Sequence, residues 1–471
     1  MDNGASEAGG GVVAPRLLIA ATRKSSGKTV TTIGLAAALV ARGYGVQLFK
    51  KGPDFIDPMW HRAATGRPGR NLDHFMMTPE TIVDSFIRHA SRADISLIEG
   101  NLGLFDGQDL EGSDSSAGMA NQLDAPVVLV IDVKGMARGV APLINGHTGF
   151  PGGGERIAGV ILNNVASQRA ERRIRAAVER FCDVPVLGVI PRSTDVVIDE
   201  RHLGLVPVEE DEALQDVIKQ AGDHVGQHLD LDAILSIARA VPPLVPLAQA
   251  ERPTIRSGQG LRIGYAADAA FNFYYQENLE RLSETGIELI PVSFLDDQQL
   301  PRVDGLFIGG GFPEMFMERI AANRSLHRHL REAARDGLPI YAECGGLMVL
   351  GRSLRWQEKS VPMTGVLPFD IEMCKKPQGY GYMVVEGSGE AFWPQKGEKI
   401  ACHEFHYSRV INADPDLRYA YRVLRGSGVD GGRDGILYRN VFASYAHIHA
   451  AGTPSWVGFL VDFWRKGGAV T

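Results

Sequence analysis

Short runs of consecutive apolar residues alternate with longer helical patterns along the first half of the chain. A clear helical pattern covers 29–43, and the apolar runs lie at 17–22, 46–50, 95–100, 126–133, 159–164 and 185–190. Strands buried on both faces have apolar side chains at successive positions, because neither face meets water. The pattern therefore predicts an α/β domain in which crossover helices connect the strands of a doubly wound parallel sheet.

A proline-rich stretch, VPPLVPLAQAERPTIRSGQG, interrupts this alternation at 241–260. Its four prolines and lack of helical period are typical of an extended linker. The alternation then resumes, with helical patterns at 273–285 and 316–336, and strands and turns predominate from residue 356 onward. The expected organisation is a loose tail at 1–15, a first domain at 16–240, the linker at 241–260 and a second domain at 261–466.

Composition restricts the class of protein. The chain has 471 residues, which exceeds one compact core, and its 44% hydrophobic and 22% charged residues argue against disorder and coiled coil. A net charge of −7 argues against a general binder of nucleic acid or membrane surfaces. The four cysteines form no CxxC pair, the start of the chain is polar, and no apolar run approaches about 18 residues. We expect a soluble, cytoplasmic protein.

The sequence SSGKT follows the first apolar run and precedes a helical pattern. Backbone N–H groups at such a turn bind phosphates, the lysine adds charge, and the threonine hydroxyl can coordinate Mg²⁺. Thr22 stands where the first glycine of GxxxxGK[ST] belongs. Glu99, at the end of a neighbouring apolar run, is a second expected Mg²⁺ ligand. The residues expected to bind ATP phosphates are Ser25, Ser26, Gly27, Lys28 and Thr29.

A basic segment follows the second apolar run. Between residues 50 and 70 it has five Lys or Arg against two Asp, the reverse of the whole chain. Loops at the carboxyl ends of parallel strands bind ligands, so a polyanionic substrate could dock here, although an ordinary solvated loop is the alternative. The expected contacts of that substrate are Lys50, Lys51, Trp60, His61, Arg67 and Arg70.

The second domain contains a candidate nucleophile, Cys344, between an apolar run and a helical pattern. Two glycines follow it, as in a nucleophile elbow, and the helix N-terminus would favour the thiolate. The alternative is a buried structural cysteine. Another glycine loop at 309–311 offers N–H groups for an oxyanion hole, and the residues expected to form this site are Gly310, Gly311 and Gly345.

Two histidines near the C-terminus, His447 and His449, are two positions apart in SYAHIHA. On a strand they would share one face, which makes a base available to the cysteine. A zinc site with His403 and His406 is disfavoured, because HEFH is not HExxH and its surroundings look like β-structure.

Eight motifs occur in the order found in a known family. They are SSGKT, FKKGPDFIDP, AATGRPGRNLD, EGNLGLFDG, GGGFPE, YAECGGLM, CHEFHYS and SYAHIHA, and with them the chain resembles the cobyrinate a,c-diamide synthase family over roughly residues 16–465. The resemblance implies a dethiobiotin-synthetase-like ATPase domain joined to a class I glutamine amidotransferase domain. The implied activity is ATP- and glutamine-dependent amidation of the side-chain carboxylates of a tetrapyrrole.

The resemblance also assigns roles. Cys344 would attack the glutamine amide with His447 as its base, and His449 stands where many class I amidotransferases have an acid, which leaves the residue orienting His447 open. Released ammonia would attack a substrate carboxylate that ATP has converted into an acyl phosphate. Arg23 stands where related dimeric P-loop ATPases have a signature lysine, a departure that leaves activation across a dimer open, and a homodimer is the assembly considered. The other positions implied by motif are Asn163 for adenine, Asp54 for Mg²⁺ and Asp57 for substrate.

The identity of the tetrapyrrole stays open between members of the family. The segment FKKGPDFIDPMW is more similar to the sirohaem branch than to cobyrinate and hydrogenobyrinate enzymes, which have FKVGPD at this place. This similarity slightly favours sirohaem as the substrate. Two further alternatives are an amidotransferase for another polycarboxylate, such as a peptidoglycan precursor, and a P-loop switch ATPase with a C-terminal domain that only binds a partner. Cys344 and His447 argue against the switch ATPase, since a binding module needs neither.

Overall fold

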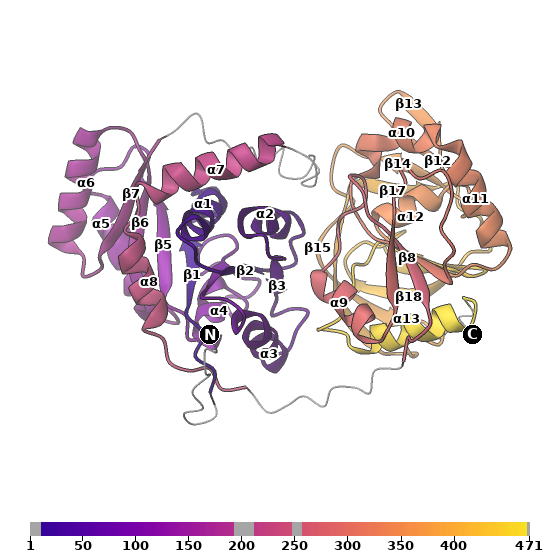
Figure 1. Ribbon diagram of the computed structural model, residues 1–471, viewed down its shortest axis with the longest axis horizontal. Helices are drawn as coiled ribbons and strands as arrows, with labels where there is room; N and C mark the ends of the chain where they lie inside the picture. The colour runs from indigo at the N-terminus through magenta and orange to yellow at the C-terminus, as the bar shows by residue number, and fades with distance from the viewer. Residues whose placement is uncertain (1–10, 193–211, 247–256, 469–471) are drawn as a thin grey trace. The chain divides into compact units, whose positions relative to one another are not determined.

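The computed structural model describes residues 11–192, 212–246 and 257–468, and the chain divides into two compact units (Figure 1). Unit 1 holds the described residues before 247, and unit 2 holds those after 256.

Unit 1 contains a seven-stranded sheet in the order β3-β2-β4-β1-β5-β6-β7, and each neighbouring pair is parallel. The carboxyl ends of its strands therefore lie along one edge, where ligands bind in folds of this type. The doubly wound parallel sheet predicted from the apolar runs is confirmed. The strands are β1 (Arg16–Ala21), β2 (Val46–Lys51), β3 (Arg70–Leu72), β4 (Ile95–Glu99), β5 (Val127–Asp132), β6 (Ile157–Val165) and β7 (Val186–Pro191).

Helices cover both faces of this sheet. Leu48 of β2 belongs to a core shared with helices α1, α7 and α8, whereas Phe49 turns to the other face and packs on Phe86 of α3 with ring centroids 4.7 Å apart. Successive side chains on a strand point to opposite faces, so both layers are needed to bury them. The helices are α1 (Lys28–Ala41), α2 (Ile56–Thr65), α3 (Pro79–Ala90), α4 (Ser116–Gln122), α5 (Val140–Thr148), α6 (Gln168–Phe181), α7 (Glu212–Gly226) and α8 (Leu231–Arg239), with a 3-10 turn η1 (Gly154–Arg156).

The described parts of the expected tail and linker pair with each other. Val12 and Leu244 exchange two backbone hydrogen bonds of 2.8 and 2.9 Å, and the buried guanidinium of Arg16 donates to Pro242 O at 2.9 Å. The expected tail at 1–15 and linker at 241–260 therefore each include residues that pack in unit 1. Residues 1–10 and 247–256 lie outside the described residues.

Unit 2 contains a nine-stranded mixed sheet in the order β16-β15-β18-β19-β20-β11-β10-β8-β9. Strands β20, β11, β10, β8 and β9 run parallel, and the remaining strands are antiparallel. The strands of this sheet are β8 (Arg262–Ala266), β9 (Glu288–Val292), β10 (Gly305–Ile308), β11 (Ile340–Glu343), β15 (Gly379–Gly387), β16 (Lys399–His406), β18 (Arg418–Arg425), β19 (Arg433–Tyr438) and β20 (Val441–Ser444). A second sheet has the order β13-β12-β14-β17, from β12 (Ser353–Trp356), β13 (Lys359–Pro362), β14 (Asp370–Met373) and β17 (Ser408–Ile411).

The helix predicted over 316–336 is two helices. Asn323 ends the first, and its side chain accepts a 3.3 Å hydrogen bond from Leu326 N to cap the second. An asparagine can satisfy the free N–H groups of a helix start, so the chain turns at this residue. The helices of unit 2 are α9 (Gln276–Glu284), α10 (Met317–Ala322), α11 (Arg324–Arg335), α12 (Gly345–Leu350) and α13 (Ser455–Arg465), with a 3-10 turn η2 (Pro313–Phe316).

None of the helices within the described ranges combines the length and the apolar character that crossing a membrane requires.

Candidate active sites

The turn between β1 and α1 takes a shape that requires glycine. Gly27 has a φ of 91°, and a Cβ at this position would lie 2.2 Å from Asn163 Nδ2. The Asn163 amide donates a 2.9 Å hydrogen bond to Ser26 O, and Ser26 Oγ donates to Arg23 O at 2.9 Å. The turn is thus wrapped tightly before the N-terminus of α1, where backbone N–H groups favour an anion.

Two side chains in the first turn of α1 reach the end of β4 and the loop after it. Lys28 Nζ donates to Leu102 O at 2.5 Å, and Thr29 Oγ1 donates to Glu99 Oε1 at 2.7 Å. Burial lowers the pKa of Lys28 to about 8, and the charge of Lys50 adds to the shift. A cation, a hydroxyl and a carboxylate at a glycine-lined helix N-terminus fit the phosphates of a nucleotide and its Mg²⁺.

Glu99 ends β4 with a fully buried carboxylate that has three polar partners. Its Oε1 lies 2.7 Å from Thr29 Oγ1 and 3.0 Å from Lys50 Nζ, and its Oε2 lies 2.7 Å from His61 Nε2. Burial alone would raise the pKa of Glu99, but Lys50 and the hydrogen bonds from His61 and Thr29 hold it well below its usual range. The carboxylate of Glu99 is therefore ionised although it is buried.

Lys50 lies between two acids, because it also pairs with the buried carboxylate of Asp57 on α2. Burial raises the pKa of Asp57, and the negative charge of Glu99 adds to the rise. Burial would lower the pKa of Lys50, but the charges of Asp57 and Glu99 raise it above its usual value. The positive charge of Lys50 is therefore engaged inside the protein.

The segment after β2 is not the open cationic loop that the sequence predicted. Residues 56–65 form α2, which buries Trp60 and His61 to 8% and 0% exposure. Lys51 and Arg70 are also buried, at 5% each. An amphipathic helix packs its apolar face on the sheet and carries the neighbouring polar groups inward with it. The structure thus brings Lys50, Asp57 and His61 together around Glu99 as one buried network.

Two of the predicted residues have other surroundings. Arg67 Nη1 donates to Arg92 O at 2.6 Å, and its Nη2 would lie 3.0 Å from a Cβ on Gly45. Arg92 and Gly45 precede β4 and β2, so Arg67 lies at the amino edge of the sheet, away from the P-loop, which corrects its grouping with the substrate contacts. Asp54 Oδ1 accepts hydrogen bonds of 2.7 and 3.1 Å from Ile56 N and Asp57 N, so it caps α2.

Cys344 lies on a sharp turn between β11 and α12. Its φ of 47° and ψ of −101° are unusual for a residue with a side chain, and it is 3% exposed. A Cβ at Gly346 would lie 2.2 Å from Ile308 O, and one at Gly345 would lie 3.1 Å from Gly311 N. Glycine is required at position 346, and a side chain at position 345 would press on the loop after β10. The predicted strand, turn and helix around the cysteine are confirmed.

The loop after β10 lies between the turn of Cys344 and the imidazole of His447. A Cβ at Gly310 would lie 2.6 Å from His447 Cε1, while Gly311 has a φ of 152° and meets the turn at Gly345. Gly309 N donates to Tyr274 OH at 2.8 Å, so this N–H is engaged. Nucleophile turn, glycine loop and histidine therefore converge in one small region.

His447 and His449 do not lie on a strand as predicted, because β20 ends at Ser444. His447 is held by two backbone hydrogen bonds to His403, of 2.8 and 3.2 Å. The ring of His449 packs against the ring of Tyr275 at a tilt of 49°, with centroids 4.6 Å apart, and its Nε2 lies 3.7 Å from Glu277 Oε2. The two histidines therefore have different neighbours and different environments.

Sequence reasoning missed Glu343, the residue immediately before Cys344. Its Oε2 lies 3.4 Å from His447 Nδ1, and both side chains are buried. A glutamate at the buried end of a strand needs a partner for its charge, and this is the signal that could have identified it.

The surroundings of Cys344 favour the neutral thiol over the thiolate. Burial raises the pKa of the Cys344 thiol, and the negative charge of Glu314 adds to the rise, so the helix N-terminus does not favour the thiolate as expected. The N–H of Gly345 acts in the opposite direction but is outweighed. Burial also lowers the pKa of His403 and of His449 to about 3 each, so both rings are neutral.

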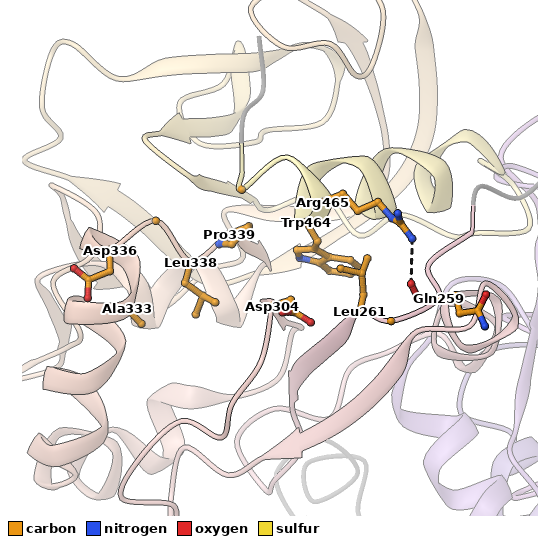
Figure 2. A pocket seen from close by; sticks show the side chains of 12 residues that line it. Gln259, Leu261, Asp304, Ala333, Asp336, Leu338, Pro339, Trp464 and Arg465 are labelled. Carbon is orange, nitrogen blue, oxygen red and sulfur yellow. Dashed lines mark hydrogen bonds between the residues drawn. The ribbon is translucent and has the colours of Figure 1, made fainter.

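A cavity of about 620 Å³ lies at the amino ends of β8, β10 and β11, the edge opposite Cys344 (Figure 2). Trp464 of α13 forms part of its wall beside Leu261 and Asp304, and Arg465 donates a 3.2 Å hydrogen bond to Gln259 O at its rim. Catalytic groups in parallel α/β sheets gather at the carboxyl ends of the strands, so this cavity is not the cysteine site.

Comparisons with known proteins match both units. Residues 17–206 match the family described as the CobQ/CobB/MinD/ParA nucleotide binding domain, and residues 262–454 match the CobB/CobQ-like glutamine amidotransferase domain. These matches confirm the predicted fold class.

Curated relatives extend over nearly the whole chain. A protein of Magnetococcus marinus named cobyrinate a,c-diamide synthase is 56% identical over 97% of this chain and 98% of its own. A protein of Archaeoglobus fulgidus with the same name is 43% identical over 92% of this chain and 94% of its own. A third, from Listeria monocytogenes, is 41% identical over 92% of this chain and 96% of its own.

Proposed function

The chain belongs to the cobyrinate a,c-diamide synthase family and is a glutamine-dependent amidating ligase, and from this premise we propose that it amidates acetate side chains of a tetrapyrrole. The observation that carries the proposal is that one chain has both a glycine-lined phosphate turn and a buried cysteine whose turn packs on the same glycine loop as His447. The first suits activation of a carboxylate by ATP, and the second suits release of ammonia from glutamine.

In unit 2, Cys344 attacks the side-chain amide of glutamine. His447 takes the thiol proton and returns it to the leaving nitrogen, so that the carbon–nitrogen bond breaks and a thioester forms. Water then hydrolyses the thioester and releases glutamate. Gly310 and Gly311 supply the loop that faces the developing oxyanion, and Gly345 lets this loop approach the cysteine.

In unit 1, a substrate carboxylate takes the terminal phosphoryl group of ATP and becomes an acyl phosphate. A free carboxylate resists attack by ammonia, whereas an acyl phosphate has a good leaving group. Lys28 and the turn at Ser25, Ser26 and Gly27 bind the phosphates, and Thr29 and Glu99 would hold Mg²⁺, which would neutralise phosphate charge. Asn163 keeps the turn closed and adjoins the place for adenine.

Cobyrinate is the first candidate substrate, because the curated relatives that cover the chain bear its name. Sirohaem is the second candidate, and the segment around Lys51 and Trp60 favours it. Both side chains are buried, at 5% and 8% exposure, so in the described structure that segment does not display them to a ligand.

A substrate panel tests this proposal. The purified protein is incubated with glutamine, Mg²⁺ and ATP, and with cobyrinic acid, sirohaem or sirohydrochlorin, and mass spectrometry counts the amides formed. We expect two amides on cobyrinic acid. Amidation of sirohaem alone would select the second candidate, and no product from any of the three would contradict the tetrapyrrole proposal.

Two variants separate the roles of the two units. Cys344→Ala should lower glutamine-dependent amidation by at least about a thousandfold and leave ammonia-dependent amidation intact. Lys28→Ala should stop amidation with either nitrogen source and leave glutamine hydrolysis intact. Equal loss of both nitrogen sources in Cys344→Ala would contradict the role of the nucleophile.

A further inference from the structure

Glu343 is the last residue of β11, so one strand end supplies both this carboxylate and the cysteine that follows it. The side chain is 3% exposed, and its Oε2 lies 3.4 Å from Nδ1 of His447, which is 1% exposed. The backbone of His447 is fixed independently by its two hydrogen bonds to His403. The imidazole therefore has the loop at Gly310 near its Cε1 and a carboxylate near its Nδ1.

A second layer of side chains fixes the carboxylate. Tyr341 OH donates a 2.9 Å hydrogen bond to Glu343 Oε1, and Trp456 Nε1 donates a 3.0 Å hydrogen bond to Tyr341 OH. Tyr341 and Trp456 are both fully buried. Ile448 N also points to Glu343 Oε1, at 3.5 Å. Since Tyr341 and Ile448 act on Oε1, the other oxygen of Glu343 is directed to the histidine.

A neighbouring glutamate provides an internal comparison. Glu277 lies 3.7 Å from His449, the residue that occupies the position of the usual acid two places after the base. Burial lowers the pKa of His449 to about 3, so it stays neutral. The pair of Glu277 and His449 therefore resembles the pair of Glu343 and His447 in composition and burial. It does not include His447, however, which is the proposed base.

We propose that Glu343 is the positioning residue of His447 and takes the place of the acid that the His-x-His sequence lacks. The inference rests on the proposed function of Cys344 and His447. With Nδ1–H directed to Glu343, Nε2 is left to accept the proton of the Cys344 thiol. The carboxylate then stabilises the imidazolium that forms and keeps its tautomer. A separation of 3.4 Å is long for a hydrogen bond, and catalytic contacts of this kind shorten when substrate binds.

The test compares Glu343→Gln with the matched variant Glu277→Gln in the full chain, using the kinetics of glutamine hydrolysis. We expect Glu343→Gln to lower kcat by roughly 10²- to 10³-fold with less than about a twofold change in KM. The amide keeps the volume of the side chain but removes the charge that holds the imidazolium. Glu277→Gln should stay within about threefold of the parent protein.

The pH profile is a readout that a purely structural role would not change. Removal of a neighbouring negative charge disfavours the protonated form of a base, so the acid limb of kcat/KM should move to lower pH in Glu343→Gln. Tyr341→Phe keeps Glu343 but removes its hydroxyl partner, and we expect a loss of about three- to tenfold in kcat. This second variant gives a result even where Glu343→Gln does not fold.

Three outcomes would overturn the inference: Glu343→Gln with unchanged kcat, an equal loss in Glu277→Gln, or a loss confined to KM. Ammonia-dependent amidation distinguishes this failure from failure of the proposed function. If the parent protein amidates with ammonia and Cys344→Ala loses glutamine hydrolysis, the proposed function stands whatever Glu343→Gln does.

Discussion

In unit 1, the buried carboxylate of Glu99 lies within 3.0 Å of donors from Thr29, Lys50 and His61. In unit 2, the equally dry Sγ of Cys344 has the carbonyl oxygen of Phe405 at 3.5 Å, and the nearby negative charge of Glu314 opposes its ionisation. One site therefore keeps its charges ionised in the resting protein, and the other keeps its nucleophile neutral.

This difference follows from what each site has to bind. Phosphates and a divalent cation carry charge permanently, so the groups that meet them must be ionised and oriented beforehand. A thiol needs its charge only during the reaction, and a neutral thiol resists side reactions. The contrast predicts that substitutions that remove a charge lower the activity of unit 1 most. The activity of unit 2 should respond instead to a change of shape or to the loss of a single neighbouring charge.

The largest expected effect is that of Glu99→Gln. The amide keeps the size of the side chain but leaves Lys50 and His61 without the buried charge that they share. We expect amidation with either nitrogen source to fall by roughly 10³-fold, and unfolding of unit 1 to become easier by about 3 kcal/mol. Product assays and calorimetry measure the two effects.

A matched control for this variant is Glu179→Gln, which changes an exposed glutamate on α6. It should alter neither amidation nor stability. Glutamine hydrolysis should continue in both variants, and a loss of hydrolysis in Glu99→Gln would contradict the separation of charge between the two sites.

The next effect in size tests the shape of the cysteine site through Gly310→Ala. A Cβ there would lie 2.6 Å from His447 Cε1, so the imidazole must leave its present position. We expect glutamine hydrolysis to fall by about 10- to 100-fold, with unchanged ammonia-dependent amidation. Gly458→Ala on α13, where a Cβ would meet no atom within 4 Å, is the control. Equal activity of the two variants would show that His447 is not confined as described.

The sequence predicts elements whose signals are local. Apolar runs identify the strands of unit 1. The two glycines after Cys344 predict its turn, because a sharp turn from strand to helix needs small residues after the nucleophile. Contacts across the sheet are not local, and they decide which polar side chains are buried. The burial of Lys50 beside Glu99 depends on β2 and β4 being neighbours, which the sequence does not state.

Glu343 illustrates the same limit in unit 2. Its position before the nucleophile is visible in the sequence, but its contact with His447 requires the chain to return 104 positions later beside β11. The prediction that His447 and His449 share a face was wrong, because it assumed a strand that ends at Ser444. Motifs thus locate the chemistry, and the sheet order decides which groups meet.

A smaller effect should follow from Glu314→Gln. Burial raises the pKa of Glu314 to about 7, and the charge of this residue adds to the raised pKa of Cys344. Removing the charge should lower the thiol pKa and speed alkylation of Cys344 by iodoacetamide at pH 8 by about three- to tenfold.

Mass spectrometry of each labelled cysteine measures this rate, and Cys402 serves as an internal reference. Burial and other acids raise the pKa of Cys402, so its rate should not change. Glu318→Gln alters an exposed glutamate that pairs with Lys359 and should leave Cys344 as slow as in the parent protein. Faster labelling of both cysteines in Glu314→Gln would indicate loosened packing instead of a charge effect.

An effect of similar size concerns the pH dependence of ATP binding. Burial lowers the pKa of Lys28 to about 8, so the free protein loses this positive charge as pH rises through that value. Phosphates bind the ammonium form, and the Kd for ATP should therefore rise by roughly eightfold between pH 7.5 and pH 9. Lys50 should not contribute, because its raised pKa keeps it charged throughout.

The control variant Lys28→Arg keeps its charge over this range. Calorimetric titration of this variant should therefore give a Kd for ATP that is higher than that of the parent protein at pH 7.5 but constant with pH. If the Kd for ATP rose equally with pH in the parent protein and in Lys28→Arg, another group would be responsible for the pH dependence. Lys28 would then not be one of the charges with which unit 1 binds phosphate.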